Sequence, residues 1–489
     1  MFQRLVRAWL AMGILALLLV ACGDNTATPQ AVTTAAATTA APAATTAAAT
    51  TAATTTTQST GAALTTSAAT STLAAPATDA TLPQIPAGQT VTIRFSSYNY
   101  GTTGLGGKGT QQLIDEFQAK YPNIKIDARN VPSPDMLKTI VAESAAGDPP
   151  DVAQIVLNNL DYVANNLPVQ AINKIVPRAE YEDFTKHILP QALKLGVYGD
   201  SLYGSPYTFS TPTLFYNADI FKAAGLDPEN PPATWDEVLK DALQIKQKTG
   251  KEGVVINGLP DTFDWLVQSL INSNGGTTIS ADHKKATFNE APAVEAVTMW
   301  QNLVKQGAHP KLSAADAVPL MVNGNLAMMV NTTALLPSLV NGAQGKWDLR
   351  TAAEPSFGTK QVHPVNSGSA LFMFSKDPLK QRAAWEFLKF VSSQRGYTII
   401  TGTIGYLPLR DDVVNDPNFL KPVLDKDPRM LPTIKQLSSL ETWVSWPGDS
   451  VQAVTIFMQA VSDVVYSGQD PQKTLDTAAG RVTDLINKK

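Results

Sequence analysis

The sequence predicts an α/β fold, and three observations lead to this prediction. Short apolar stretches alternate with segments of helical periodicity from residue 91 onward. Residues that start or stop helices stand between these stretches at the places where an α/β chain needs them. The length of 489 residues allows more than one domain with a sizeable core.

The alternation is clearest in the first part of this region. Strands are predicted over 91–97, 124–128 and 152–157, and helices over 111–120 and 136–146. A strand that is followed by a helix and then by another strand forms a parallel pair in most α/β proteins, because the helix carries the chain back. The segment therefore predicts parallel sheets.

The run LYGSPYTFSTPTLFYNADIFKAAGLDPENPPATWDEV, over 202–238, is dense in local signals. Its apolar, aromatic residues 214–216 predict a short strand. Asp219 is predicted to cap a brief helix that ends at Gly225. Thr234 and Glu237 form a capping box, so a second helix is expected to start at Thr234.

The rest of the chain continues the pattern. Further strands are predicted over 253–256, 326–331 and 369–374. The pairs Asp377-Pro378 and Asp470-Pro471 each predict the start of an amphipathic helix, the second of which is the last in the chain.

The N-terminal residues have a different composition. Arg4 and Arg7 precede an apolar run that ends in Leu19-Val20-Ala21-Cys22, the pattern of a bacterial lipoprotein signal peptide over 1–21. Cys22, the single cysteine, is predicted to be lipidated and to anchor the chain to the membrane. Residues 22–89 are rich in Ala and Thr and predict a disordered tether. An ordinary secretory signal with an incidental Cys22, or an uncleaved anchor helix, is the alternative.

The charge balance argues against several classes of partner. The formal net charge of −4 gives no field suited to nucleic acid or to anionic lipid. The four histidines fall in no metal-ligand spacing, so neither a metal nor a cofactor is expected.

Motifs of catalysis are weak. Gly104, Gly106 and Gly109 spell GxGxxG, which is interpreted as a flexible loop before the first helix. Walker A and GxSxG motifs are missing from the sequence. The pair Asp411-Asp412 is interpreted as solvated loop charges. These observations predict a protein that is not an enzyme.

Three motifs carry a resemblance to a known family: the run over 202–238, GNLAMMV over 324–330 and GYLPL over 405–409. Together they resemble the family 1 extracellular solute-binding proteins of ABC importers, over about 90–489. The stretch STPTLFYN, over 210–217, is most similar to the glycerol-3-phosphate and oligosaccharide binders of that family.

The resemblance implies a two-lobed periplasmic-binding-protein fold of type II. Each lobe would hold a mainly parallel sheet flanked by helices, and hinge crossings would fall near Thr208, Ala352 and Thr398. Lobe 1 would comprise 90–207 and 353–396, and lobe 2 would comprise 208–352 and 397–489. The expected protein is a monomer on the extracytoplasmic side that delivers its ligand to ABC permease subunits.

Some candidate binding residues follow from their position after strands. A sugar needs aromatic platforms for its C–H faces and fixed polar groups for its hydroxyls. Tyr98 and Asn99 follow the first strand directly and offer both. Asn158, like Asn159, follows the strand that ends at Leu157, at a carboxyl end where α/β folds place ligands.

The resemblance implies further contacts. Trp265 matches a cleft tryptophan, with core packing as the alternative, and Tyr406 of GYLP matches a ligand contact, with packing against the lobe as the alternative. Trp446, like Trp443, is a candidate stacking platform or a packing residue of the lobe. The remaining matched positions are Ser210, Thr332, Thr333 and Gly368.

The ligand is expected to be a neutral mono- or oligosaccharide. A phosphate dianion favours arginine forks or helix N-termini. Where the glycerol-3-phosphate branch carries an arginine, this chain has 451–456 without one, and an acidic position of that branch is replaced by the neutral Leu157-Asn158. A glycerol-3-phosphate or other polyol-phosphate binder is the alternative, and a surface-tethered glycoside-acting enzyme or a sensor input is a further one.

Overall fold

The computed structural model describes residues 80–102, 104–259 and 264–488. The predicted signal peptide, Cys22 and most of the predicted tether lie outside these residues. The described residues lie in one compact unit.

The elements up to the first change of sheet are β1 (Val91–Ser97), α1 (Leu105–Lys120), β2 (Ile124–Asn130), α2 (Ser133–Ala145), β3 (Val152–Val156), α3 (Leu160–Asn166), α4 (Ile172–Ile175), α5 (Arg178–Thr185), α6 (Pro190–Lys194), β4 (Val197–Tyr198), β5 (Ser201–Leu202) and β6 (Gly204–Ser210). Next come β7 (Pro212–Asn217), α7 (Ala218–Ala224), α8 (Trp235–Thr249), β8 (Glu252–Ile256), α9 (Trp265–Ser273), α10 (Ala291–Lys305), α11 (Ala314–Val322), β9 (Leu326–Thr332), α12 (Leu336–Ala343) and β10 (Leu349–Ala352). The last part holds β11 (Ser367–Met373), α13 (Pro378–Val391), α14 (Gln394–Ile399), α15 (Lys421–Lys426), α16 (Leu431–Ile434), α17 (Ser450–Val465) and α18 (Pro471–Ile486).

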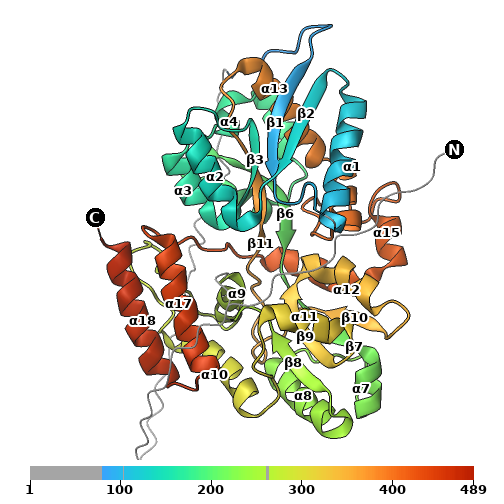
Figure 1. The fold of residues 1–489 in the computed structure, drawn as a ribbon, viewed down its shortest axis with the longest axis vertical. Coiled ribbons are helices and arrows are strands. Elements are labelled where there is room, and N and C mark those ends of the chain that lie inside the picture. Colours follow the sequence, from blue (N-terminus) through green and yellow to red (C-terminus); the bar gives the residue numbers. More distant parts are fainter. Residues whose placement is uncertain (1–79, 103, 260–263, 489) are drawn as a thin grey trace, which may run out of the picture. The chain divides into compact units, whose positions relative to one another are not determined.

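Two larger sheets organise these elements. The first has the strand order β2-β1-β3-β11-β6 and the second β10-β7-β9-β8. In Figure 1 each of the two sheets is surrounded by its own helices, and β6 of the first sheet leads into β7 of the second. Only Thr211 separates these two strands, so the chain changes sheets there. The lobe boundaries expected from the sequence stay a prediction.

The α/β class is confirmed, but the expectation of mainly parallel sheets needs correction. β1 runs parallel to β2 and β3, and β8 runs parallel to β9. In contrast, β11 is antiparallel to β3 and β6, and β7 is antiparallel to β9 and β10. β7 follows directly on β6 of the first sheet, and β11 returns to the first sheet after β10 of the second. Neither strand is reached by a helical crossover within its own sheet, so the usual parallel constraint does not apply to them.

Most local signals of the sequence are confirmed. The capping box of Thr234 and Glu237 is present, and Gly225 ends α7 with a φ of 78°. The caps of α13 and α18 are the predicted Asp377 and Asp470. The prediction that Asp219 caps α7 is wrong. The cap is Asn217, whose side chain accepts from the backbone N–H groups of Asp219 and Ile220. Asp219 lies in the first turn, where its charge favours the helix dipole instead.

The glycine-rich segment also differs from its interpretation as a loop. Helix α1 begins at Leu105, so Gly106 and Gly109 lie in its first turns. A Cβ at Gly109 would lie 2.3 Å from the Ile404 side chain, closer than real atoms approach. Glycine is thus needed at Gly109 for close packing of the helix.

Both faces of the second sheet are buried. Leu214 and Tyr216 of β7 belong to one hydrophobic cluster, which includes side chains of α9, α10, α17 and α18. Phe215, between them in the sequence, belongs to the other cluster, which includes the core of the first sheet. The alternation of side chains along a strand therefore makes β7 a bridge between two cores.

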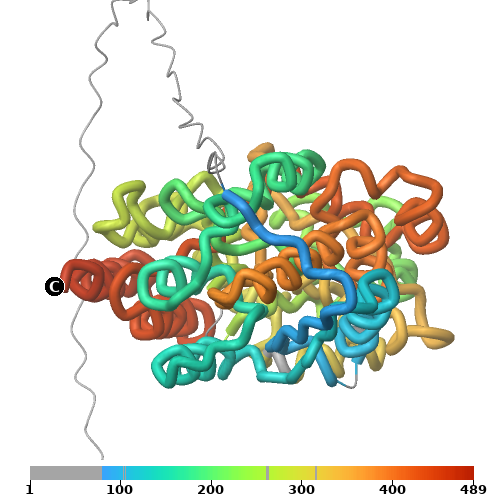
Figure 2. The backbone as a smooth tube through the Cα atoms, turned by 90° about the horizontal axis from the view of Figure 1, so that it is seen from above, coloured from blue at the N-terminus to red at the C-terminus, as the bar shows by residue number. Residues whose placement is uncertain are grey.

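The first described residues lie along α13 (Figure 2). The guanidinium of Arg382 donates to the carbonyl oxygens of Leu82 and Pro83 at 2.6 and 3.1 Å. Arg382 also forms two-oxygen contacts with Glu180 at 2.7 and 3.0 Å. This buried arginine fixes the start of the folded part. Among the helices of the described residues, none is long and apolar enough to span a bilayer.

Candidate functional site

A row of four buried polar side chains crosses the first sheet. Ser97 of β1 donates its hydroxyl to Oε1 of Gln154 of β3 at 2.6 Å. The Gln154 amide nitrogen donates to Oγ of Ser369 of β11 at 2.9 Å, and Ser369 lies 2.5 Å from the Thr208 hydroxyl of β6. Each of these residues is fully buried. The row therefore joins four adjacent strands of the sheet by buried polar side chains.

Tyr98 and Tyr406 lie against this row. Burial raises the pKa of the Tyr98 hydroxyl, and the neighbouring polar groups of Ser369, Thr208 and Gln154 partly offset the rise. Burial also raises the pKa of Tyr406 well above its usual value, and the neighbouring Thr208 partly offsets the rise. Both hydroxyls thus stay protonated at neutral pH and are available as donors. Both residues are predicted binding residues, and the structure brings them together although they lie 308 positions apart in the sequence.

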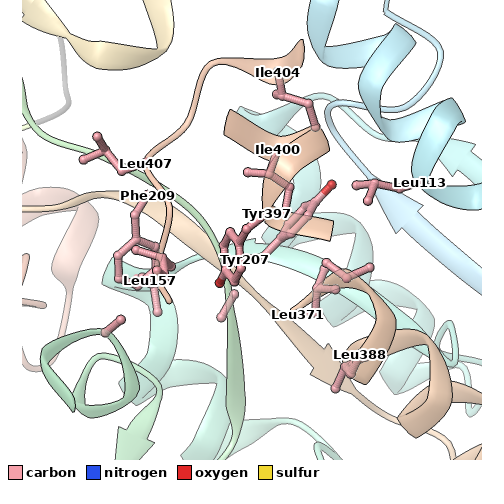
Figure 3. Packing of buried hydrophobic residues seen from close by; sticks show 14 of the residues in the cluster. Leu113, Leu157, Tyr207, Phe209, Leu371, Leu388, Tyr397, Ile400, Ile404 and Leu407 are labelled. Carbon is pink, nitrogen blue, oxygen red and sulfur yellow. The ribbon is translucent and has the colours of Figure 1, made fainter. Parts of the chain in front are cut away.

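The loop of Tyr406 is tied to β6. The backbone N–H of Leu407 donates to the carbonyl oxygen of Phe209 at 2.8 Å. Figure 3 shows Tyr207 and Phe209 among the apolar side chains of this region, with Tyr397 and Leu407 beside them. Gly405, with a φ of 99°, turns the chain before Tyr406. Packing and the turn therefore hold the tyrosine in place.

Asn99 and Asn158 both retain unused polar atoms. Asn99 is buried, and its side-chain nitrogen has no hydrogen-bond partner among the described residues. The side-chain oxygen of Asn158 also lacks a partner within the described part of the chain. Asn158 lies in a 3-10 turn directly after β3, at the same end of the sheet as Tyr98. A buried amide atom without a partner is expected to need one, such as a water or a ligand.

Three other predicted residues, Ser210, Thr332 and Thr333, meet where the chain changes sheets. Thr332 donates to the Ser210 hydroxyl at 2.7 Å, and Ser210 donates to the Ser367 carbonyl at 2.8 Å. The Thr333 hydroxyl donates to the Thr211 carbonyl at 2.9 Å and lies 3.2 Å from the Thr211 amide. These hydroxyls are engaged in holding the crossing strands together.

Gly368 has a packing role at this crossing. It pairs with Phe209 across β11 and β6, and a Cβ there would lie 2.0 Å from the Thr208 carbonyl oxygen. Any larger side chain would force the two strands apart. The closeness of the backbones explains why this position holds glycine.

On the side of the second sheet, a buried hydrogen-bonded group surrounds Asp264, just before α9. Its two carboxylate oxygens accept the indole N–H groups of Trp443 and Trp446 at 2.8 and 2.9 Å. Gln268 donates to the same carboxylate at 2.8 Å and accepts from the Val444 amide at 3.0 Å. Asp264 therefore fastens the segment 443–446 to α9. Burial raises the pKa of its carboxyl group, and the three donors partly offset that rise.

The expectation that Trp446 is a stacking platform needs correction. Trp446 is only 2 % exposed and packs against Phe288 and Phe457, at ring distances of 5.9 and 5.8 Å. A ring enclosed in this way has no open face for a sugar, and the packing role is the one observed. Trp265, the residue after Asp264, is 7 % exposed and also belongs to a core cluster.

His187, Asp411 and Asp412 form a cluster near the surface. The spacing of the histidines in the sequence did not predict it. Nδ1 of His187 lies 3.1 Å from Asp411 and 3.7 Å from Asp412. Arg410 already contacts both oxygens of Asp412, at 2.8 and 2.7 Å. Asp412 thus forms an ion pair with Arg410, and Asp411 contacts His187. Such surface contacts contribute little to stability.

Sequence reasoning also missed the polar row itself. Its members are Ser97, Gln154, Thr208 and Ser369. A signal was present, because Gln154 stands in the otherwise apolar strand VAQIV. A buried glutamine in such a strand must find partners, and only neighbouring strands can supply them. Which strands are neighbours was not readable from the sequence.

Solved structures show what kind of fold carries this site. The cyclic alpha-maltosyl-1,6-maltose binding protein of Arthrobacter globiformis matches with a TM-score of 0.71 and 22% identity, over 81% of this chain and 99% of its own. UgpB of Mycobacterium tuberculosis, in complex with glycerophosphocholine, matches with a TM-score of 0.69 and 20% identity over the same shares. The fold is thus that of the two-lobed type II periplasmic binding proteins.

Sequence comparison then identifies the family. A model described as bacterial extracellular solute-binding protein matches residues 112–431, which is more than half of the chain. The chain belongs to this family. The sn-glycerol-3-phosphate-binding periplasmic protein UgpB of Escherichia coli (strain K12) is 25% identical over 415 residues, covering 78% of this chain and 90% of the relative. These relatives are binding proteins and not enzymes.

Proposed function

We propose that this protein captures a neutral mono- or oligosaccharide between its two lobes and delivers it to an ABC importer. The observation that carries the proposal is the meeting of Tyr98 and Tyr406 with the polar row of the first sheet. Aromatic rings beside fixed hydrogen-bonding groups suit a ligand with C–H faces and hydroxyls. The unused amide atoms of Asn99 and Asn158 supply further partners at that end of the sheet.

The charges of the site favour a neutral ligand over a phosphate. Asp264 is a buried carboxyl group on the second-sheet side, and its oxygens accept from three side chains. An ionised carboxylate repels a phosphate dianion, whereas a sugar hydroxyl can donate to it. Polyol-phosphate binding is the second candidate, because several relatives are named for glycerol-3-phosphate.

The same proposal includes the way the protein is held and the way it moves. Lipidation of Cys22 and a flexible segment over 22–89 would keep a monomeric binding domain at the outer face of the membrane. Closure of the lobes around the ligand would create the form that docks on the permease subunits. The hydrogen bonds of Ser210, Thr332 and Thr333 lie where such a motion would bend the chain.

Calorimetry and thermal unfolding with a panel of sugars and glycerol phosphates test the proposal. We expect heat of binding and a raised melting temperature with at least one neutral sugar, and no product when an oligosaccharide is incubated with the protein. Tyr98→Ala and Tyr406→Ala are expected to weaken binding, and Tyr162→Ala, on the exposed face of α3, serves as the control.

A wild-type chain that binds no sugar of the panel would overturn the proposal. Preference for a glycerol phosphate would select the second candidate, and release of a product from an oligosaccharide would show an enzyme. Unchanged affinity in both site variants would refute the site while leaving the function intact.

A further inference from the structure

Two of the segments that connect the two sheets change sheets side by side. β6 ends at Ser210, and β7 begins at Pro212. The returning segment enters the first sheet at Ser367, the first residue of β11, which pairs with Ser210. The Ser210 hydroxyl also donates to the Ser367 carbonyl at 2.8 Å. A rotation of one sheet against the other would therefore bend both segments at the same place.

The segment over 353–366, which precedes this point, is fastened to α9 on the side of the second sheet. The backbone N–H of His363 donates to the Ser273 hydroxyl at 3.0 Å. The backbone N–H of Val365 donates to the Ser269 hydroxyl at 3.2 Å. Both serines are buried. Bending within the segment would break these bonds, which favours a turning point after Val365 over one at the start of the segment.

A third connecting segment crosses between Asp412 and Arg429. The Asp412 carbonyl accepts from the side chain of Gln394 at 2.9 Å, in α14, which packs against α1 beside the first sheet. The Arg429 carbonyl accepts from the hydroxyl of Thr351, in β10 of the second sheet. Gln436 follows on the same side and is buried. The chain has therefore completed its third crossing before it reaches Gln436.

The side chain of Gln436 joins the three segments. Its Oε1 accepts the backbone N–H of Glu354, in the second segment, at 2.8 Å. Its Nε2 donates to the Pro212 carbonyl at 3.2 Å and lies 3.5 Å from the Thr211 hydroxyl, in the first segment. One amide can satisfy both a backbone N–H and a carbonyl, because it has an acceptor end and a donor end. The three segments are thus held at one point on the side of the second sheet.

We propose that Gln436 is a positioning residue of the hinge: it holds the three connecting segments together, so that the lobes turn about one narrow axis at 210–211 and 366–367. The second part of the first lobe then begins at Ser367. This inference rests on the proposed function, in which the lobes close around the ligand. A hinge held at one point limits the orientations that the free lobes explore, so a larger fraction of the chain is ready to close.

Distances between two spin labels, one on each lobe, test the proposal in the full chain. The labels are attached to Tyr162→Cys in α3 and Lys473→Cys in α18, two exposed positions beside different sheets (Figure 1). Cys22→Ala leaves these two thiols as the only ones in the chain. Gln436→Met keeps the length of the side chain and removes its hydrogen bonds. Gln301→Met is the matched control, because this buried glutamine also donates to two backbone carbonyls, in a different part of the core.

Without sugar we expect one narrow distance distribution in the labelled parent chain and in Gln301→Met, and a broader one in Gln436→Met, although both substitutions lower the melting temperature. The sugar that binds best from a panel of maltose, maltotetraose and glucose should shorten the distance in the parent chain. Gln436→Met should bind this sugar about threefold more weakly or worse, because a smaller fraction of it is ready to close. Lost stability alone does not broaden the distance between folded lobes, so this measurement separates positioning from a structural role.

Hydrogen exchange of the wild type gives a second measurement that needs no substitution. The backbone amides of His363 and Val365 should stay protected with and without the sugar, because their segment moves with the second lobe. Changes on binding should be confined, within the connecting segments, to residues close to 210–211 and 366–367. Loss of protection across 353–366 when the sugar binds would show that this segment itself bends, and would overturn the proposal.

Equally narrow distributions in the two methionine variants, with the affinity of the parent chain, would overturn the proposal and leave the sugar-binding function standing. Equal broadening in both variants would also overturn it, because a general loss of stability would then be the cause. If Gln436→Met fails to fold, the exchange measurement decides. A wild-type chain that binds no sugar of the panel would overturn the proposed function, whereas the distributions without ligand would still decide on the role of Gln436.

Discussion

The hydroxyl of Ser269 donates to Oε2 of Glu354 at 2.7 Å, and this is the one hydrogen bond of the Glu354 carboxyl group within the described chain. Glu354 is 2 % exposed and follows β10, on the segment that leads back to the first sheet. Its backbone N–H donates to Gln436, whose amide reaches the Pro212 carbonyl at 3.2 Å. Burial raises the pKa of this carboxyl group to about 8, so it is protonated at neutral pH.

The raised pKa predicts that stability falls as the pH rises. The unfolded chain releases the Glu354 proton near pH 4.5, whereas the folded chain holds it up to about pH 8. Between these values the folded state binds more protons, so the free energy of unfolding decreases with pH, by on the order of 3 kcal/mol up to neutral pH. Glu354→Gln removes this titration, and urea unfolding at pH 5 to 8 should show a flatter profile than the wild type. Parallel profiles would contradict the prediction.

A second carboxyl group predicts the opposite dependence. Glu180 contacts Arg382 and Lys389 and accepts from the Trp385 indole at 2.8 Å. Burial opposes its ionisation, but these partners prevail and lower its pKa to about 2. Its contribution is therefore complete above pH 4.5 and is lost as the pH falls toward 2.

Glu180→Gln should accordingly destabilise the protein by roughly 2–3 kcal/mol at pH 7 and by less in acid. Thermal unfolding across this range measures the difference. Glu182 lies two residues further along α5, and its side chain is exposed. Glu182→Gln is therefore the control, which should leave stability nearly unchanged. Equal losses at pH 7 and pH 3 would show that the ion pairs are not the cause.

Gly368→Ala should be strongly destabilising for a steric reason. The new methyl group would lie 2.0 Å from the Thr208 carbonyl oxygen, so β11 and β6 would have to separate. We expect a loss of about 2 kcal/mol or more. Gly480→Ala, in α18, has open space around the added methyl group and should be neutral or slightly stabilising. Chemical unfolding of both variants checks this contrast, which equal effects would refute.

Asp264→Asn should loosen the segment 443–446. The wild-type carboxylate accepts one indole N–H on each oxygen, and an asparagine offers only one oxygen and places an NH2 group against the other indole. We expect a loss of roughly 1–3 kcal/mol and a change in tryptophan fluorescence. Asp115→Asn on the exposed face of α1 is the matched control. Unaltered fluorescence and stability would mean that the carboxylate is not the fastening group.

Much of the local structure was readable because its causes are local. The capping box at Thr234 and the αL glycine at Gly225 depend on residues within one turn of each other. The error at α7 arose between two good capping residues, Asn217 and Asp219, where the end of β7 decides which of them is the cap. Sheet direction was less readable, because β11 joins its sheet from a distant part of the chain.

The candidate site was predicted in part for the same reason. Tyr98, Asn99 and Asn158 follow strands, and a position after a strand can be read from the sequence. Trp446 was misjudged because the indole that suits a sugar also suits a core, and only the position of Asp264 distinguishes the two. Gln154 was missed because its meaning lies in partners on three other strands.

The sequence by itself determined the α/β class, the helix ends, the resemblance to solute-binding proteins and the change of composition before residue 90. These are set by short-range backbone preferences and by composition, which need no knowledge of distant contacts. Tertiary structure alone decided that Ser97, Gln154, Ser369 and Thr208 form one hydrogen-bonded row near Tyr98 and Tyr406. The physical reason is that a buried hydrogen bond needs both donor and acceptor in place, and here they come from strands up to 272 residues apart.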